Sequence, residues 1–313
     1  MRTIASYILK GPIQAVLSAA VPAAVSVSAP FLLKLILIYF SGIAIALVSL
    51  RLGARKGLTV LLVAALAALL AGQLIALSEQ ARLDLWNSVY LWTLLWLAAS
   101  VLQATRSLAL ALETIGLVAI VTIAVFFLLV DQPVQMGMQL LEPMGRLLRD
   151  PASGLSSQEV TEMMLSAATI LAGSVVAYTA FGAVICLLIA RAWQARLFNP
   201  GGLQMEFRAL RLGRNVGLFT ILVIVGLMFA RHLGEPLSLI LMNASIVIGM
   251  LYVIVGLGVA HGLMAQKDSS GFWLVGLYAL LIILSQVVAP MLMILALTDI
   301  WVDYRARFAK KLS

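Results

Sequence analysis

Charged residues are scarce in this chain of 313 residues, because Asp, Glu, Lys and Arg together make up only 11% of it. Hydrophobic residues make up 63%, and the mean hydropathy is +1.09. A soluble domain of this size could not bury so many apolar side chains, whereas the hydrocarbon of a bilayer accepts them readily. The composition therefore predicts an all-α, polytopic transmembrane bundle, with residues 1–313 forming one integral membrane domain.

Residues that carry chemistry are equally scarce. The chain has one cysteine, Cys186, so no internal disulfide can form, and its place within an apolar run indicates a packing role. The two histidines, His232 and His261, fall near opposite ends of predicted spans. No P-loop, HExxH, CxxC or GxSxG motif is present. We therefore expect no cofactor, no metal site and no enzymatic activity.

The formal net charge is +8, which in a soluble protein could indicate a nucleic-acid partner. In this chain the Lys and Arg residues occur in short clusters between apolar runs and do not build one basic face. Clusters of this kind mark the cytoplasmic ends of membrane spans. We therefore expect the lipid bilayer to be a partner of the protein, and we expect no nucleic-acid partner.

Nine apolar stretches approach the roughly 20 residues that a transmembrane helix needs, which predicts a bundle of about eight to ten spans. The stretches cover residues 12–29, 31–50, 57–77, 86–102, 108–130, 164–190, 215–231, 237–264 and 272–302.

The basic residues also predict an orientation. If the N-terminus is cytoplasmic, eleven Lys and Arg residues up to residue 236 fall in inner segments against four in outer segments. The basic tail, residues 304–313, conflicts with this arrangement, because nine spans would place it outside. A break at Val288, Ala289 and Pro290, with residues 291–301 returning as a short re-entrant piece, would bring the tail inside, since proline interrupts helices.

The phrase LRLGxxxGL occurs twice, at Leu50–Leu58 and at Leu210–Leu218. Its arginine can meet lipid headgroups, and its two glycines allow a sharp turn or close packing of the next helix. Either the phrase marks a parallel internal repeat, with halves 1–130 and 164–313 joined by an outer segment 131–163, or two helix entries converged on one solution. The residues concerned are Arg51, Gly53, Gly57, Arg211, Gly213 and Gly217.

The longest predicted outer segment, residues 131–165, is amphipathic. Apolar residues recur in it at helical spacing, while Gln, Glu and Arg occupy the other faces. This pattern predicts an interfacial helix that either lies on the outer leaflet or acts as a lid, and Pro143 is expected to kink or split it. Ser156 followed by Glu159 predicts a helix cap before the next span. The apolar positions are Met136, Leu140, Met144, Leu147 and Leu148.

Three polar residues are predicted deep within spans: Glu113, Asn243 and Gln286. Polar groups at such depth are costly and usually face protein or a water-filled cavity, so these three are the candidates for binding a substrate. Each has a structural alternative. Glu113 lies seven residues after Arg106 and could form an ion pair, and the two amides could bond neighbouring helices.

A row of small residues lies on the first predicted span. Ala15, Ala19 and Ala23 recur at four-residue spacing, which lets another helix approach closely, either within the chain or on a partner protein.

Opposite charges lie close together near the C-terminus. Asp299 and Asp303 are one helical turn apart, and Arg305 and Arg307 follow them. Two acids and two bases near a membrane interface can neutralise one another, which predicts that they fix the end of a helix.

Three phrases in the chain carry a family resemblance. They are RLGARKGL at residues 51–58, GLGVAHGLMAQK at 256–267, with glycines ahead of His261, and ALTDIWVDYRARF at 296–308. In this order they resemble the YybS-like family of bacterial multi-pass membrane proteins over nearly the whole chain. That family is distantly similar to the membrane-embedded S components of energy-coupling-factor transporters, which capture vitamins, and to a cell-shape membrane protein.

The resemblance implies a bacterial inner-membrane location and small-molecule capture, without any catalytic residue. S components dock their transport partner through small residues on an early helix, and the matching row in this chain is Ala15, Ala19 and Ala23. The chain differs from S components by having several more spans and a long outer segment. Likeness of fold alone is weak support for a function.

These observations lead to one functional hypothesis and two alternatives. The first is an inner-membrane protein that binds or transports a small molecule in a cavity entered from outside under residues 131–165. The second is a non-catalytic scaffold that recruits envelope or cell-division proteins. The third is an intramembrane enzyme acting on lipid, which would require Glu113 or Asp299 to line a groove open to lipid.

Overall fold

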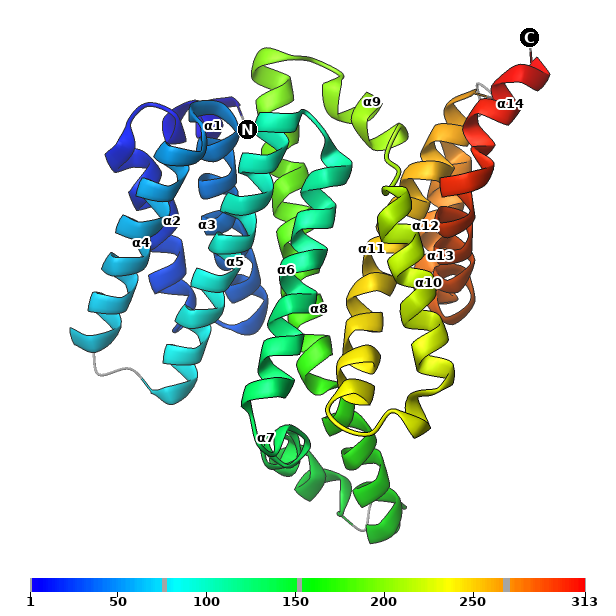
Figure 1. Cartoon of the computed structure of the whole chain (residues 1–313). Coiled ribbons are helices and arrows are strands. Elements are labelled where there is room, and N and C mark those ends of the chain that lie inside the picture. Colours follow the sequence, from blue (N-terminus) through cyan, green and yellow to red (C-terminus); the bar gives the residue numbers. More distant parts are fainter. Residues whose placement is uncertain (1, 75–77, 151–153, 267–270, 313) are drawn as a thin grey trace. The chain divides into compact units, whose positions relative to one another are not determined.

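The computed structural model describes residues 2–74, 78–150, 154–266 and 271–312, and every regular element within these ranges is a helix (Figure 1). The elements are α1 (Arg2–Ile8), α2 (Pro12–Ser26), α3 (Phe31–Leu52), α4 (Ala54–Leu74), α5 (Glu79–Thr105), α6 (Leu108–Leu129), α7 (Pro133–Leu148), α8 (Ser157–Phe198), α9 (Gly202–Arg208), α10 (Arg214–Met228), the 3-10 helix η2 (Ala230–His232), α11 (Leu237–Gln266), α12 (Phe272–Ile283), α13 (Ser285–Val302) and α14 (Tyr304–Leu312).

The prediction of an all-helical membrane bundle is confirmed. Each of the nine predicted apolar stretches contains a helix, and residues 75–77 of the third stretch lie outside the described residues. Within the described ranges, six helices are long and apolar enough to cross a membrane, namely α3, α5, α6, α8, α11 and α13. The apolar helices α2, α10 and α12 have only 10–17 residues, which is short of the roughly 20 that a span needs. Helix α4 has 21 residues, and residues 75–77, which follow it, lie outside the described ranges, so the number of eight to ten spans stays a prediction.

Packing divides the chain into two compact units. Unit 1 comprises Met1–Ile115, Thr179–Arg214 and Leu251–Ser313, and unit 2 comprises Gly116–Tyr178 and Asn215–Met250. Helices α6, α8 and α11 contribute residues to both units. Each unit also draws on both predicted halves of the chain, so the units and the halves are different divisions. The internal repeat stays a prediction.

Small residues bring the first helices of unit 1 together. Helix α2 packs against α3 and α4, and its residues Ala15, Ala19 and Ala23 are buried. Small side chains let helix backbones approach closely, which increases van der Waals contact where lipid supplies little hydrophobic driving force. The alanine row is thus a packing surface inside the chain, whereas the resemblance implied that it would be free to dock a transport partner.

Two tryptophans tie α5 to neighbouring segments through their ring nitrogens. Trp92 is fully buried, and its Nε1 donates to the Oγ of Ser41 in α3 at 2.9 Å. Trp96 Nε1 donates to the main-chain oxygen of Ala54, at the start of α4, at 2.8 Å. A buried indole needs a partner for its single donor, so these two bonds fix how α5 meets α3 and α4.

The two LRLGxxxGL phrases lie at helix starts but differ in conformation. Gly53 ends α3 with a φ of +91°, a conformation that favours glycine, and α4 begins at the next residue. A Cβ at Gly57 would clash with Ser49 of α3, so this glycine permits close packing of α3 and α4. In the second phrase, α10 begins directly after Gly213, which has no positive φ, and Gly217 is buried. The sharp turn therefore occurs only in the first copy.

In unit 2, α7 packs onto α8 through glycine. A Cβ at Gly137 would lie 3.0 Å from the main-chain oxygen of Ala168, and one at Gly145 would clash with Met164. Helix α7 continues through Pro143, so the predicted split does not occur. These glycines hold the amphipathic helix against the long helix that follows it.

The start of α8 has the predicted cap. The Oγ of Ser156 accepts a hydrogen bond from the main-chain nitrogen of Glu159 at 3.2 Å. The carboxylate of Glu159 in turn accepts one from the main-chain nitrogen of Ser156 at 2.8 Å. This reciprocal pair is a capping box, which satisfies two main-chain donors that the first helical turn would leave unpaired.

Helices α12 and α13 form a hairpin that turns at Leu284 (Figure 1). Gln266 at the end of α11 donates to the main-chain oxygen of Arg305 in α14 at 3.0 Å, which joins these two helices. The predicted break at residues 288–290 was wrong, because Pro290 lies inside α13. Proline disturbs the helical turn that precedes it, and the chain leaves the helix just before that turn.

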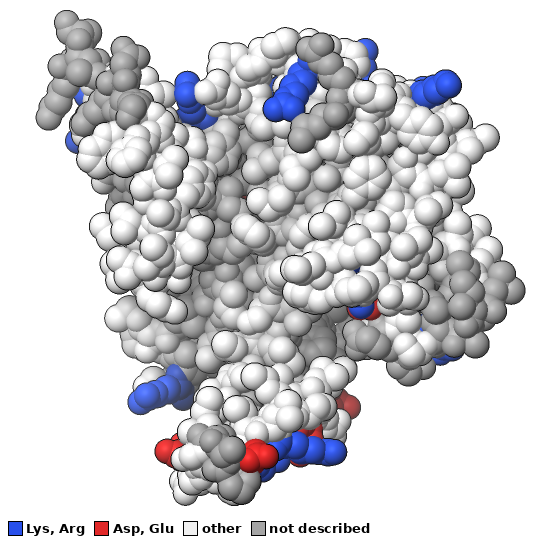
Figure 2. All heavy atoms as spheres, turned by 180° about the vertical axis from the view of Figure 1, so that it is seen from behind, with Lys and Arg blue, Asp and Glu red and all other residues white. Residues whose placement is uncertain are grey.

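Large apolar side chains are exposed on several helices. Leu222, Met228, Ile282 and Ile283 are examples from α10 and α12. Figure 2 shows wide areas without Lys, Arg, Asp or Glu, and the charged side chains on that face occur in small groups. Soluble monomers rarely expose apolar patches larger than roughly a few hundred Å². This surface therefore indicates contact with lipid.

Replacing Gly57 by alanine is expected to destabilise the protein, because the new Cβ would clash with Ser49. Overpacking of this kind costs about 1–3 kcal/mol, which should lower the thermal unfolding temperature in detergent. Gly276→Ala in α12 is the matched control, since a Cβ there meets no atom within 4 Å. Equal unfolding temperatures for the two variants would show that α3 and α4 do not pack closely at Gly57.

Candidate functional sites

Unit 2 contains an apolar pocket between α6, α7 and α8. Its volume is about 430 Å³, which lies within the range of about 300–1,000 Å³ typical of small-molecule sites. The residues that line it include Phe126 and Phe127 of α6, Met136 and Leu140 of α7, and Ala172 and Val176 of α8.

Small residues on α7 and α8 shape this pocket. The two helices meet closely where Gly137 contacts Ala168. One turn further along α8, Ala172 contributes only a methyl group to the wall. Thr122 also lines the pocket, but its hydroxyl already donates to the main-chain oxygen of Val118 at 2.8 Å. The pocket therefore offers mainly van der Waals contact and suits hydrocarbon groups.

The pocket is open along α7. Met136 and Leu140, which line it, are exposed. They belong to the predicted apolar stripe of the interfacial helix, and Met144 and Leu147 of the same stripe are exposed as well. The polar side of α7 carries Glu142, whose carboxylate lies 3.1 Å from Arg149 and 3.5 Å from Arg146. An apolar stripe on such a helix normally faces acyl chains.

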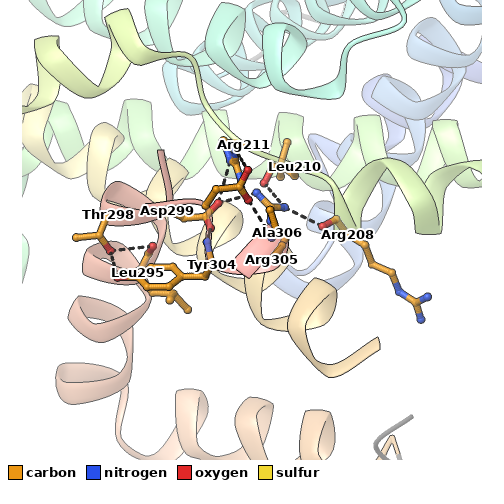
Figure 3. Close-up of polar contacts among 10 residues, drawn as sticks. Arg208, Leu210, Arg211, Leu295, Thr298, Asp299, Tyr304, Arg305 and Ala306 are labelled. Carbon is orange, nitrogen blue, oxygen red and sulfur yellow. Dashed lines mark hydrogen bonds and ion pairs between the residues drawn. The ribbon is translucent and has the colours of Figure 1, made fainter. Parts of the chain in front are cut away.

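Unit 1 contains a cluster of charged side chains at the junction of α13 and α14 (Figure 3). The side chain of Asp299 is 0% exposed. Its carboxylate accepts hydrogen bonds from Arg211 at 3.0 Å, from Arg305 at 2.6 Å and from the main-chain nitrogen of Tyr304 at 3.0 Å. An unpaired carboxylate shielded from water would be very costly, so the two arginines stabilise its charge.

Asp303 completes the cluster from a main-chain conformation with a positive φ of 51°. Its carboxylate binds the guanidinium of Arg211 and caps α14 by accepting from the main-chain nitrogen of Ala306 at 3.2 Å. The hydrogen bond from Arg211 lowers the pKa of Asp303 to about 2, and the same bond raises the pKa of Arg211. Both groups therefore stay charged at neutral pH.

The cluster ties the tail to the connection between α9 and α10. Arg305 donates to the main-chain oxygens of Arg208 at 2.8 Å and Leu210 at 3.0 Å. Arg211, the shared partner of both aspartates, lies 88 positions before Asp299 in the chain. The sequence predicted pairing among the charges of the tail, but no local pattern could identify a partner so far away.

Other basic segments meet at the same end of unit 1. The guanidinium of Arg51 lies 3.9 Å from the ring centre of Phe198. Gln194 donates to the main-chain oxygen of Leu50 at 3.0 Å, and Arg191 pairs with Glu206 of α9. The ends of α3 and α8 therefore lie together with α9. The side of the membrane on which this end lies stays a prediction.

Asn243, a predicted substrate-binding residue, joins α11 to α8 within unit 2. It is fully buried, and its Nδ2 donates to the main-chain oxygens of Thr169 at 2.9 Å and Leu239 at 2.8 Å. Its Oδ1 accepts from the main-chain nitrogen of Gly173 at 2.7 Å. These contacts match the structural alternative, in which the amide bonds neighbouring helices.

Glu113 and Gln286, the other two predicted substrate-binding residues, lie in different environments from Asn243 and from each other. Glu113 is half-buried and accepts a hydrogen bond from the main-chain nitrogen of Gly213 at 2.6 Å. Its partner is thus the second LRLGxxxGL phrase rather than the side chain of Arg106. Gln286 is exposed in the first turn of α13. Each of the three predicted residues therefore has a separate environment.

His261 packs between two aromatic rings. The centres of the Phe207 and Tyr278 rings lie 5.3 Å and 5.8 Å from the centre of its imidazole, both edge-on. Its Nδ1 lies 2.8 Å from the main-chain oxygen of Leu257. Among the residues that the structure describes, no group of three or more His, Cys, Asp and Glu side chains is arranged to hold a metal ion.

Residues 86–300, more than half of the chain, match a family described as a predicted membrane protein, DUF2232. The chain belongs to the DUF2232 family. Neither a curated protein nor a solved structure matches it. The matched region contains every lining residue of the unit 2 pocket, together with Arg211 and Asp299. Asp303, Arg305 and the alanine row of α2 lie outside the DUF2232 match.

Asp299→Asn is expected to destabilise the protein strongly, because two arginines lose a charged, buried partner. Breaking a buried ion pair costs about 3–5 kcal/mol. Asp303→Asn should cost less, since the Asp303 side chain is 43% exposed and Arg211 keeps Asp299 as a partner. Thermal unfolding in detergent and the rate of trypsin cleavage after Arg305 would compare the variants. Equal effects would contradict a central role for Asp299.

Proposed function

We propose that the protein binds a small apolar or amphipathic molecule in the pocket of unit 2 and takes part in moving it across the bacterial inner membrane. The observation that carries this proposal is the pocket of about 430 Å³ between α6, α7 and α8. It has the size of a small-molecule site, and the amphipathic helix α7 forms one of its walls.

The wall chemistry defines the kind of ligand. Phenylalanine, leucine, methionine, valine and alanine side chains can gain apolar contact but cannot replace the hydration of a charged group. A strongly polar molecule would therefore lose more in dehydration than it gains on entering. The proposed ligand has a hydrocarbon chain or ring system within the pocket and its polar group at the opening beside α7.

The exposed apolar stripe of α7 indicates how the ligand enters. Met136 and Leu140 belong both to the pocket wall and to this stripe. A helix of this type lies at the boundary between headgroups and acyl chains. The ligand therefore enters sideways from the bilayer, and α7 acts as the lid that is held to α8 at Gly137.

We place the arginine-rich loops of the chain in the cytoplasm and α7 outside. The support is the excess of Lys and Arg in alternate connections, eleven against four. By alternation of spans, residues 131–163 then lie on the opposite side from residues 51–56 and 191–214. The ligand pocket is accordingly assigned to the outer leaflet.

The YybS-like resemblance, with its distant similarity to S components, supports capture of a small molecule. An S-component-like partnership would need a docking surface other than the buried row on α2. The scaffold alternative relied on the same row and finds no support in it. We also propose that the protein is not an enzyme, since the carboxylates of Glu113 and Asp299 are engaged by its own main chain and arginines.

Filling the pocket should remove its ligand. Ala172→Phe places a ring in the pocket, whereas Ala167→Phe on the same helix adds the same ring at an exposed position. Mass spectrometry of protein purified in mild detergent should find a bound molecule with an apolar chain or ring system in the wild type and in Ala167→Phe, and little of it in Ala172→Phe. An empty wild-type protein, or full occupancy of Ala172→Phe, would contradict the proposal.

The orientation can be checked with single cysteines. In spheroplasts, Arg146→Cys in α7 should react with a membrane-impermeant maleimide, whereas Arg55→Cys and Arg196→Cys should react only after the membrane is opened. The native Cys186 is buried, so it should give little background. Equal labelling of positions 55 and 146 in spheroplasts would overturn the assigned sides.

A further inference from the structure

A second depression lies at the basic end of unit 1, beside the arginine and aspartate cluster. It is an open groove of about 630 Å³ between the segment that holds α9, the end of α11 and the junction of α13 with α14. Its lining includes Met205 and Arg208 of α9, Gly262 and Gln266 of α11, and Asp303 and Arg305. The groove thus combines apolar, basic and acidic side chains.

The charged side chains that line this groove differ in how far they are already paired within the protein. Arg305 is occupied by Asp299 and by two main-chain oxygens, and Arg211 is occupied by both aspartates. Arg208 contributes only its main-chain oxygen to the cluster. Figure 3 shows its guanidinium extending away from the carboxylate of Asp299, and it has no partner among the residues that the structure describes.

Among the described residues that line the groove, one positive charge is therefore not neutralised. The positive charges of Arg211 and Arg305 are neutralised by Asp299 and Asp303. The charge of Arg208 is not neutralised by these two aspartates. A guanidinium presents paired donors that match the oxygens of a phosphate. The remaining charge makes this groove a suitable site for an anionic group.

Apolar surface lies directly beside this charge. Met205 also lines the groove, and it is 65% exposed. It precedes Arg208 by one helical turn, so the two side chains share one side of α9. A small soluble anion would gain no apolar contact from an exposed methionine, whereas a phospholipid has both a phosphate and apolar acyl chains.

We propose that this groove binds the headgroup of an anionic phospholipid. The phosphate lies against the guanidinium of Arg208, and the glycerol and the first part of the acyl chains lie along Met205. Basic pockets at the ends of membrane helices are suited to such headgroups on the cytoplasmic side. The site belongs to unit 1 and does not rest on the pocket of unit 2.

Lipid binding to purified, delipidated full-length protein tests this site. The probes are phosphatidylglycerol and phosphatidylcholine with identical acyl chains, titrated in detergent and followed by native mass spectrometry. The wild type should bind phosphatidylglycerol more tightly. Arg208→Gln should weaken that binding about tenfold, because one hydrogen-bonded charge pair contributes roughly 1.5–3 kcal/mol and each 1.4 kcal/mol is a factor of ten.

Arg307→Gln is the matched control for net charge. Arg307 is exposed on α14 and does not line the groove, so its loss should leave the preference for phosphatidylglycerol nearly unchanged. The proposal is overturned if both variants weaken binding equally, or if the wild type binds both lipids equally. It is also overturned if glycerol 3-phosphate binds as tightly as phosphatidylglycerol, because the ligand would then be a soluble phosphate.

The unit 2 pocket provides an internal check on the two sites. Ala172→Phe should block the pocket of unit 2 but leave the groove of unit 1 intact, because Ala172 does not line that groove. It should therefore keep the preference for phosphatidylglycerol over phosphatidylcholine. If Ala172→Phe abolishes that preference while Arg208→Gln retains it, the headgroup selectivity does not come from the groove.

Discussion

Hydrocarbon cannot form hydrogen bonds with a polypeptide, and this constraint explains most of the structure. Main-chain groups must pair within their own segment, so the elements seen in the described residues are helices. Side chains obey the same rule. The hydroxyls of Ser49 and Thr93 donate to main-chain oxygens one turn earlier in their own helices. Asn243 and Asp299, which are both fully buried, each have three hydrogen bonds.

A consequence of the same solvent is that small residues, rather than large apolar ones, decide how the helices pack. Lipid tails are as apolar as leucine, so burying leucine gains little, and close contact has to supply the stability. Gly57 lies against Ser49, and Gly173 lies against Asn243. In both cases the glycine leaves no room for a side chain. The polar partner at each contact is a small residue or an amide that bonds main chain.

Features that depend on neighbouring residues could be predicted from the sequence. The helical stretches, the capping box of Ser156 and Glu159 and the glycine turn at Gly53 each arise within a few positions. Partnerships between distant residues could not be predicted in this way. Glu113 binds the main chain of Gly213, 100 positions later. An apolar pocket is even harder to predict, because residues that line it, such as Phe126 and Ala172, are of the same types as residues that fill a packed core. The amphipathic pattern of residues 131–165 was its only local sign.

The different roles of the polar and the apolar side chains affect how selectively the proposed pocket can bind a ligand. Polar residues within spans usually indicate a ligand site, yet here Glu113 and Asn243 form hydrogen bonds with the protein's own main chain, and the proposed site is defined by shape. A hydrophobic pocket distinguishes ligands by only about 1–3 kcal/mol for each added or missing methylene. Strong rejection of a wrong ligand requires polar groups that would be left unpaired. If the proposed function holds, the pocket would select a class of apolar molecules by size, because its described lining is almost entirely apolar.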